Sequence, residues 1–267
     1  MSADDARIRI IADEMIAAHT QARVCTCPSD LTLEDAYDVA FEIFRKRLGA
    51  GLRLAGRKIG MTNRRMWAQY GVDGPLWGYV YNRSLRTEGA DVSYSLAGLV
   101  EPKIEPEIVF GLRAVPKSGA SHEELLACIE WVAHGFEIVH SHVRGWGFTA
   151  AQAVADFGLH ASLLVSTRVP VANLRDPLRA LREFRISLFC NGEERDHGTG
   201  ASVLDSPLNA LGFLVKALAD APQYPPLQPW EVVTTGTLTA ALPVSRGETW
   251  HTQIEGIELD GMRVRFA

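Results

Sequence analysis

Two glutamates, Glu105 and Glu107, lie in an apolar run that constrains the fold more than any other feature of the chain. Residues 103–110 read KIEPEIVF, and the Ile, Val and Phe side chains favour a β-strand. Residues i and i+2 of a strand point to the same face, so we expect both carboxylates to project side by side. Adjacent like charges are costly unless a cation lies between them. The pair therefore indicates a divalent-cation site or, as the alternative, an exposed strand face with two solvated glutamates.

A third glutamate, Glu137, lies in a second β-like run at residues 135–140, GFEIVH. If the two strands are neighbours, three carboxylates converge, and oxygen ligands suit Mg²⁺, Mn²⁺ or Ca²⁺ rather than Zn²⁺. Such a site leaves coordination positions open for water and a bidentate substrate. The alternative is that Glu137 faces solvent on a half-buried strand. His140 and His142 would point to the opposite strand face, which argues against them as direct ligands.

A lysine, Lys58, lies between glycines and apolar residues in the segment 56–62, GRKIGMT. In such surroundings an ammonium group can be held half-buried, where it pairs with an anion or changes its pKa. The alternative is an ordinary lysine at the edge of a strand.

Several motifs occur in a characteristic order along nearly the whole chain. They are GRKIGMT at 56–62, GVDGPLWG at 71–78, PKIEPEI at 102–108, FEIVHSH at 136–142, GTG at 198–200, SPLNA at 206–210 and VTTGT at 233–237. Together they resemble the 2-keto-4-pentenoate hydratase / 4-oxalocrotonate decarboxylase family, which belongs to the fumarylacetoacetate hydrolase superfamily. The resemblance implies a metal-dependent lyase that acts on a small 2-oxo acid.

The same resemblance assigns roles to individual residues. It implies a Mg²⁺ or Mn²⁺ ion held by Glu105, Glu107 and Glu137, and it implies that Lys58 is the active-site lysine. A 2-oxo acid offers a carboxylate oxygen and a keto oxygen to such an ion, which would polarise the carbonyl group and favour an enolate. Lys58 would then bind the substrate carboxylate or relay protons.

The fold that the resemblance implies is α+β, a mixed β-roll of the fumarylacetoacetate hydrolase type with a helical N-terminal region. We expect residues 1–85 to form that helical region together with the lysine-bearing strand, and residues 86–267 to form a β-rich catalytic domain. Asn191-Gly192 and Asp260-Gly261 lie between β-like runs and predict tight hairpins. No glycine-rich dinucleotide fingerprint opens a helix, which argues against a Rossmann fold.

Helical periodicity is confined to a few segments. Apolar residues recur at helical spacing over residues 3–20 and 33–49, which predicts two helices at the front of the chain. A capping pattern predicts a third helix over about residues 121–131. Ser206 followed by Pro207 predicts the start of a fourth helix.

One position distinguishes the two activities of the family. The family's hydratases resemble Pro-Asp-Phe-Gly where this chain has Leu76 and Trp77 between Pro75 and Gly78. The missing aspartate is a candidate acid or base for handling water, and an apolar residue there resembles the decarboxylases. Lys103, before Ile104 and the first glutamate, is also closer to the decarboxylases. The sequence therefore favours decarboxylation over hydration.

A second departure concerns the far end of the substrate pocket. The family's Val-Ala-Asp-Asn-Ala-Ser is here Val-Ala-Asp followed by Phe157, Gly158, Leu159 and His160. Phe157, Leu159 and His160, together with Leu76, are the predicted substrate-binding residues. Fewer polar groups at that end predict a 2-oxo acid with an apolar or aromatic tail. The alternative is that this segment packs the core and that His142 or Arg144 binds a distal carboxylate. Trp146 and Phe148 are further candidates for lining the pocket, with core packing as the alternative.

Composition limits the other classes of function. The chain has 267 residues, 47% of them hydrophobic, and a net charge of −5, with no basic cluster for nucleic acid. It has no apolar run long enough to span a membrane and no evident signal peptide. Its four cysteines match no disulfide or zinc pattern, so we expect reduced thiols and a cytoplasmic location. We also expect a homo-oligomer.

Three hypotheses stay open from the sequence. The first is a metal-dependent lyase, decarboxylase or hydratase. The second is a carbon–carbon bond hydrolase of the wider superfamily, which needs a base such as His160 or His142 to activate water. The third is a non-catalytic relative that binds a small acid.

Overall fold

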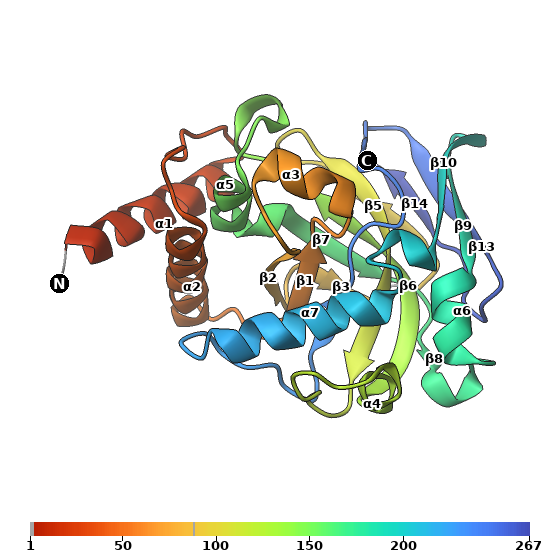
Figure 1. Ribbon diagram of the computed structural model, residues 1–267. Coiled ribbons are helices and arrows are strands. Elements are labelled where there is room, and N and C mark those ends of the chain that lie inside the picture. Colours follow the sequence, from red (N-terminus) through yellow and green to blue (C-terminus); the bar gives the residue numbers. More distant parts are fainter. Residues whose placement is uncertain (1–2, 88) are drawn as a thin grey trace.

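Two β-sheets form the body of the protein, and helices pack around them (Figure 1). The computed structural model describes residues 3–87 and 89–267. The larger sheet has nine strands: in spatial order β2 (Leu76–Tyr81), β1 (Leu54–Gly60), β11 (Val232–Thr234), β5 (Lys103–Leu112), β6 (Ile129–Val139), β7 (His160–Val165) and β3 (Leu85–Arg86), with β12 (Leu242–Pro243) paired to β5 and β8 (Val169–Pro170) paired to β6. The second sheet has five strands in the order β10 (Glu193–Thr199), β9 (Arg185–Cys190), β13 (Thr249–Glu255), β14 (Arg263–Phe266) and β4 (Asp91–Tyr94).

The helices of the described ranges are short apart from three. They are α1 (Ala3–Gln21), α2 (Leu33–Gly49), α3 (Trp67–Tyr70), α4 (His122–Ala127), α5 (Ala150–Ala155), α6 (Pro177–Glu183) and α7 (Pro207–Asp220), with single turns of 3₁₀-helix at η1 (Arg64–Met66), η2 (Arg144–Trp146), η3 (Phe157–Leu159), η4 (Val171–Asn173) and η5 (Gly200–Ser202). None of the helices within these ranges has the length and apolar character that crossing a bilayer requires.

The core between the two sheets decides which face of β5 and β6 is apolar. Ile104, Phe136 and Ile138 of the larger sheet pack against Leu188 and Trp250 of the smaller sheet, and each is at most 2% exposed. Because side chains alternate along a strand, the neighbouring odd-numbered residues of β5 and β6 point to the other face. The three glutamates occupy those odd-numbered positions.

The two front helices form where the periodicity predicted them. Thr32 caps α2 by accepting a hydrogen bond from the backbone of Asp35, whose side chain bonds back to Thr32. The buried stripe of α2, which includes Val39 and Ile43, belongs to the main hydrophobic core, and Met15 of α1 lies in the same core. The helical front therefore shares one hydrophobic core with β1, the strand that carries Lys58, through Ile59.

Two later helices begin at their predicted caps, but one ends early. Ser206 caps α7, whose first residue is Pro207. Ser121 caps α4, yet this helix ends at Ala127, so the prediction of a helix to about residue 131 was wrong. The residues from Ile129 onward pair with β5 as strand β6, and this long-range pairing overrides the local helical pattern.

One of the two predicted hairpins is a different structure. Asn191-Gly192 does join β9 to β10 in a tight turn. Asp260-Gly261 does not form a tight turn, since β13 and β14 pair only as far as His251 and Arg263 and a longer segment connects them. A Cβ atom at Gly261 would meet the carbonyl oxygen of Thr252 at 2.1 Å, so this glycine permits close backbone packing.

Candidate metal centre

Strands β5 and β6 bring three glutamate side chains together on one face of the larger sheet. Glu105 lies directly opposite Glu137 in the antiparallel register, and Glu107 follows two residues later on β5. One carboxylate oxygen from each of the three lies within 4.8 Å of the other two. The three carboxylates converge as their spacing suggested, while their role as metal ligands stays a prediction.

Glu107 is fixed by the end of a neighbouring strand. Its Oε2 accepts hydrogen bonds from the Thr234 hydroxyl and from the backbone N–H of Gly236, the latter at 2.8 Å. Gly236 has φ +101°, and a Cβ atom there would meet Thr62 Oγ1 at 2.4 Å, so glycine is required at this position. The second oxygen, Oε1, is buried and accepts no hydrogen bond from the described residues.

Glu137 is held by a histidine and a lysine. His160 Nδ1 lies 2.7 Å from Glu137 Oε1, and the other ring nitrogen, Nε2, lies 2.8 Å from Ser84 Oγ. Lys58 Nζ lies 3.2 Å from Glu137 Oε2, an ion-pair distance. Both partners orient the carboxylate, as the hydrogen bonds of metal-binding carboxylates commonly do.

Lys58 projects from β1 toward the same cluster and is only 5% exposed. Its ammonium group donates a hydrogen bond of 3.0 Å to the carbonyl oxygen of Gly158 in η3. Burial lowers the pKa of Lys58, but the negative charges of Glu137, Glu105 and Glu107 more than offset it and raise the pKa above its usual value. The lysine is therefore a buried permanent cation at neutral pH.

The pKa values of the three glutamate carboxyl groups shift in different directions within this site. Burial raises the pKa of Glu105 to about 7 and raises the pKa of Glu107 well above its usual value, and nearby carboxylates add to the rise for Glu107. For Glu137 burial also acts upward, but the charge of Lys58 and the hydrogen bond from His160 lower its pKa overall. One lysine thus cannot neutralise all three carboxylates when they are ionised, and without a bound cation the cluster lowers its negative charge by retaining protons.

This donor set fits a hard divalent cation. Glu107 Oε1 is buried and accepts no hydrogen bond from the described residues, and Glu137 Oε2 has only the ion pair with Lys58, although most buried polar atoms are fully hydrogen-bonded. Carboxylate oxygens in this arrangement suit Mg²⁺ or Mn²⁺. Within residues 3–87 and 89–267 this is the one group of three or more His, Cys, Asp or Glu side chains whose ligand atoms converge.

The predicted pocket residues lie in different places around the centre. Leu76 is buried on β2 opposite Gly60, on the strand face that also carries Lys58. Phe157 packs its ring 4.7 Å from the ring of His19 in α1, so it points toward the helical front. Leu159 is half-buried with φ +65°. His160 contacts Glu137. The role of these four residues in substrate binding stays a prediction.

A group of three histidines adjoins this region, and the sequence did not reveal it. The ring centroids of His140 and His142 are 4.5 Å apart, and His19 lies 5.2 Å from His140. His142 Nδ1 lies 2.6 Å from Asp156 Oδ1, while both ring nitrogens of His140 lack a hydrogen-bond partner among the described residues. Burial lowers the pKa of His140 to about 2 and that of His19 to about 3, so both are neutral.

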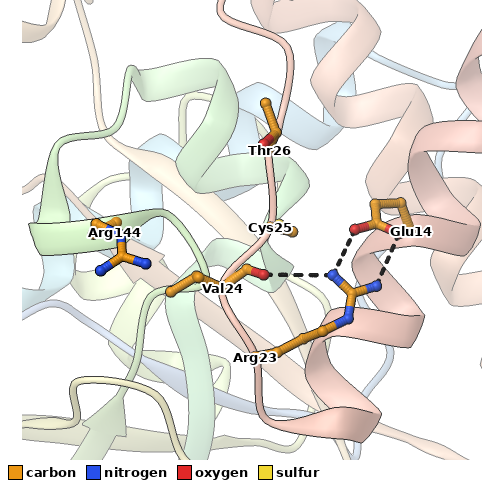
Figure 2. A pocket seen from close by; sticks show the side chains of 6 residues that line it. All are labelled: Glu14, Arg23, Val24, Cys25, Thr26 and Arg144. Carbon is orange, nitrogen blue, oxygen red and sulfur yellow. Dashed lines mark hydrogen bonds and ion pairs between the residues drawn. The ribbon is translucent and has the colours of Figure 1, made fainter.

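A separate hollow of about 470 Å³ lies between α1, the loop that follows it and η2 (Figure 2). Glu14, Arg23, Val24, Cys25, Thr26 and Arg144 line it. Arg23 forms hydrogen bonds of 2.8 and 3.0 Å with the Glu14 carboxylate and is therefore already paired. The hollow contains none of the residues that the sequence placed in the active site.

The chain is similar to known proteins along almost its whole length, although no model of a known protein family matches it. It is 30% identical to 2-hydroxyhexa-2,4-dienoate hydratase of Comamonas testosteroni, covering 90% of this chain and 89% of the relative. It is 30% identical to 4-oxalocrotonate decarboxylase of Pseudomonas sp. strain CF600, covering 92% and 91%. The solved 4-oxalocrotonate decarboxylase from Pseudomonas putida G7, complexed with magnesium and adipate, is similar with a TM-score of 0.89 at 25% identity over 98% of each chain. This likeness confirms the expected mixed β-roll.

Proposed function

Because the chain belongs to the 2-keto-4-pentenoate hydratase / 4-oxalocrotonate decarboxylase family, we propose that it is a divalent-metal-dependent lyase that acts on an enolisable 2-oxo acid. The observation that carries the proposal is the unbalanced buried cluster, in which three carboxylates face one lysine. Crowded carboxyl groups whose pKa values are raised by burial and by one another are typical of binding sites rather than of structural ion pairs.

Glu105, Glu107 and Glu137 would hold Mg²⁺ or Mn²⁺. When bound, the cation would polarise the keto group of the substrate and stabilise negative charge on its oxygen. Thr234 and Gly236 fix Glu107 from one side, so this ligand is oriented before any cation binds. Such preorganisation lowers the cost of assembling the site.

Lys58 would act on the substrate in one of two ways. Its raised pKa keeps the ammonium group charged, and its contact with Glu137 places that charge beside the carboxylate cluster. From there it would bind the substrate carboxylate or donate a proton to the enolate oxygen. The hydrogen bond to Gly158 fixes the direction of the ammonium group.

Within this family we place decarboxylation ahead of hydration. Leu76 lies on the strand face of Lys58 and is 7% exposed, so it offers no acid or base for handling water. In the decarboxylation the bond between the departing carboxylate and the carbon chain breaks, its electron pair enters the conjugated enolate, and CO₂ leaves. The enolate oxygen then takes up a proton. Hydration is the alternative, because the chain is equally identical, at 30%, to a hydratase and to a decarboxylase.

Two parallel assays on fresh protein with Mg²⁺ test the reaction. We expect CO₂ release from a 2-oxo-enedioate to exceed hydration of a 2-hydroxy-dienoate. Leu76→Asp should increase hydration, whereas the apolar control Leu76→Val should not. Efficient hydration by the unaltered protein, without CO₂ release, would reverse the order.

We also propose that the protein is a cytoplasmic homo-oligomer. Cys25, Cys27, Cys128 and Cys190 are all free thiols, which supports a reducing compartment. Burial raises the pKa of Cys25 to about 12 and that of Cys27 to about 11, so both thiols react poorly. Light scattering on the eluted protein would give the subunit number, and a monomer at every concentration would contradict the oligomer.

A further inference from the structure

Lys103 is the residue of β5 that precedes the carboxylate cluster on the same strand face. It is the first residue of the strand, two positions before Glu105, and both side chains point away from the core between the sheets. Ile104 between them is fully buried in that core. Lys103 therefore lies at the rim of the face that carries the three glutamates.

The ammonium group of Lys103 is half-buried and forms no direct ion pair with a carboxylate of the described residues. Burial lowers the pKa of Lys103, while the negative charges of Glu105 and Glu101 nearby act in the opposite direction. Its recorded contact is with an aromatic ring, because Nζ lies 3.7 Å from the ring centroid of Trp146. A cation over an indole face is attracted to the ring, but it keeps donors free for an anion.

Trp146 is held firmly in place to receive this lysine. Its indole N–H donates a hydrogen bond of 3.0 Å to the carbonyl oxygen of Glu101, and the backbone N–H of Gly145 lies 3.0 Å from the Glu101 carboxylate. Trp146 and Glu101 both have positive φ, 60° and 48°. Non-glycine residues in that region of backbone space are uncommon and concentrate at binding sites.

An aromatic row continues from Trp146 to the short helix α3. The ring centroids of Trp146 and Phe148 are 5.8 Å apart, and those of Phe148 and Tyr70 are 5.9 Å apart. The row thus connects Lys103, through Trp146 of η2, to Tyr70 of α3.

We propose that Lys103, held against Trp146, binds a second carboxylate at the far end of the 2-oxo acid and so determines substrate specificity. This proposal rests on the proposed function, in which the other end of the substrate is bound at the three glutamates. Two residues of a strand advance about 6.8 Å, and a short carbon chain between two carboxylates covers a similar length. A half-buried ammonium group without a direct ion-pair partner gains most from an anionic ligand.

This assignment differs from the apolar tail that the sequence suggested. That expectation depended on Phe157, whose ring instead packs against His19 and lies 4.2 Å from the guanidinium carbon of Arg47. The carboxylate at Lys103 would be the group that leaves as CO₂. That carboxylate loses its negative charge in the transition state, so a cation there stabilises the bound substrate at least as much as the transition state. Losing the cation should therefore raise KM without lowering kcat.

The test compares two unreactive ligands of equal chain length, 2-oxoadipate and 2-oxohexanoate, which differ by the distal carboxylate. Calorimetry with saturating Mg²⁺ should show that the unaltered protein prefers 2-oxoadipate. Lys103→Met should reduce that preference at least about tenfold, since a charged hydrogen bond is lost. Lys103→Arg should retain most of the preference. Lys117→Met, at an exposed lysine beyond the end of β5, should retain all of it.

Steady-state kinetics on a 2-oxo-enedioate give a second measurement, in which Lys103→Met should raise KM at least about tenfold without lowering kcat. The proposal about Lys103 is overturned if the unaltered protein has no preference for 2-oxoadipate, or if Lys103→Met weakens both ligands by the same factor. The proposed lyase function fails separately, if neither CO₂ release nor hydration occurs although the binding preference depends on Lys103.

Discussion

Two neighbouring residues of β1 have buried cationic side chains with different roles, one in the fold and one in the candidate metal centre. Arg57 and Lys58 point to opposite faces of the strand. Arg57 meets one carboxylate, with Nη1 at 2.5 Å from Glu231 Oε2, and both side chains are fully buried. The guanidinium group also donates to the carbonyl oxygen of Pro225 at 3.0 Å and lies over the ring of Tyr79. One positive and one negative charge are thus matched. The pair anchors the proline-rich loop at residues 221–230, which contains Pro225, to the sheet.

On the other face of β1, Lys58 forms an ion pair with Glu137 and also interacts with the charges of two further carboxylates. Hydrogen bonds satisfy only part of that cluster, since one oxygen of Glu107 has no hydrogen-bond donor among the described residues and one oxygen of Glu137 has only the ion pair with Lys58. A balanced buried pair serves the fold, because removing either partner leaves a buried charge uncompensated. An unbalanced buried cluster serves binding, because the folded chain supplies less positive charge than the site needs.

The largest effects on activity and stability should come from replacing each of the two cationic residues by methionine in separate variants. Lys58→Met should reduce kcat by at least about 10³-fold, because the charged group nearest the substrate is lost. Arg57→Met should instead lower the free energy of unfolding by about 3–5 kcal/mol, since Glu231 is left charged and buried. Steady-state kinetics and urea unfolding on both variants measure the two effects. Retained activity together with lost stability in Lys58→Met would contradict this distinction, because Lys58 would then stabilise the fold as Arg57 does.

The second prediction compares carboxylates in the metal-free protein. At pH 8.5 Glu231→Gln should lower the free energy of unfolding by about 3 kcal/mol, because it leaves Arg57 buried without a counterion. Glu105→Gln should not lower it, because this change removes one of three crowded negative charges. Urea unfolding in the presence of a chelator gives both values. Equal losses in the two variants would contradict the distinction between balanced and unbalanced sites.

The third prediction concerns the histidine that orients Glu137. His160→Leu should weaken Mg²⁺ binding by about 10- to 100-fold, the usual effect of losing a hydrogen bond to a ligand. His160→Asn is the matched control, since its amide N–H can take the place of Nδ1 and should restore part of the affinity. Calorimetry on both variants decides the point. Full affinity in His160→Leu would show that His160 does not position the ligand.

The last prediction is a pH dependence of stability. Burial raises the pKa of Glu105 to about 7 and that of Glu231 to about 7, so the folded protein retains protons that the unfolded chain releases near pH 4.5. A raised carboxyl pKa gives stability that is complete below the unfolded value and is lost as the pH rises through the folded value. The metal-free protein should therefore become less stable between about pH 5 and pH 7, by up to about 1.4 kcal/mol per pH unit for each group.

Saturating Mg²⁺ separates the contribution of the carboxylate cluster from that of Glu231. A bound cation should remove the contributions of Glu105 and of Glu107, whose pKa is also raised, and leave that of Glu231, while Glu231→Gln should remove the other part. Unfolding at pH 5 and pH 8, with and without Mg²⁺, gives the four values needed. A slope that Mg²⁺ does not change would mean that the cation does not bind near Glu105.

The sequence predicted the parts of the site that follow from strand geometry. The i, i+2 spacing of Glu105 and Glu107 placed both on one face, and the strand propensity around Glu137 placed the third carboxylate on a second strand. The same alternation argued against His140 and His142 as ligands, and neither belongs to the converging group in the described residues. The front helices followed from periodicity and capping in the same way.

The remaining contacts depend on pairing between distant parts of the chain. Thr234 reaches Glu107 from 127 residues away, and no local pattern encodes that approach. The direction of Phe157 was also hidden, because positive φ values at residues 157–159 break the alternation that a strand rule assumes. The early end of α4 has the same origin, since pairing between β5 and β6 outweighs a local helical pattern.

The central claim is that the three glutamates form one site for a divalent cation. Calorimetric titration of Mg²⁺ into the metal-free protein and into Glu107→Gln tests it most directly. The unaltered protein should bind one Mg²⁺ per chain, and Glu107→Gln should lose at least about 100-fold in affinity, roughly 2.7 kcal/mol, with no loss of thermal stability in the metal-free state. Unchanged affinity in the folded variant would contradict the account.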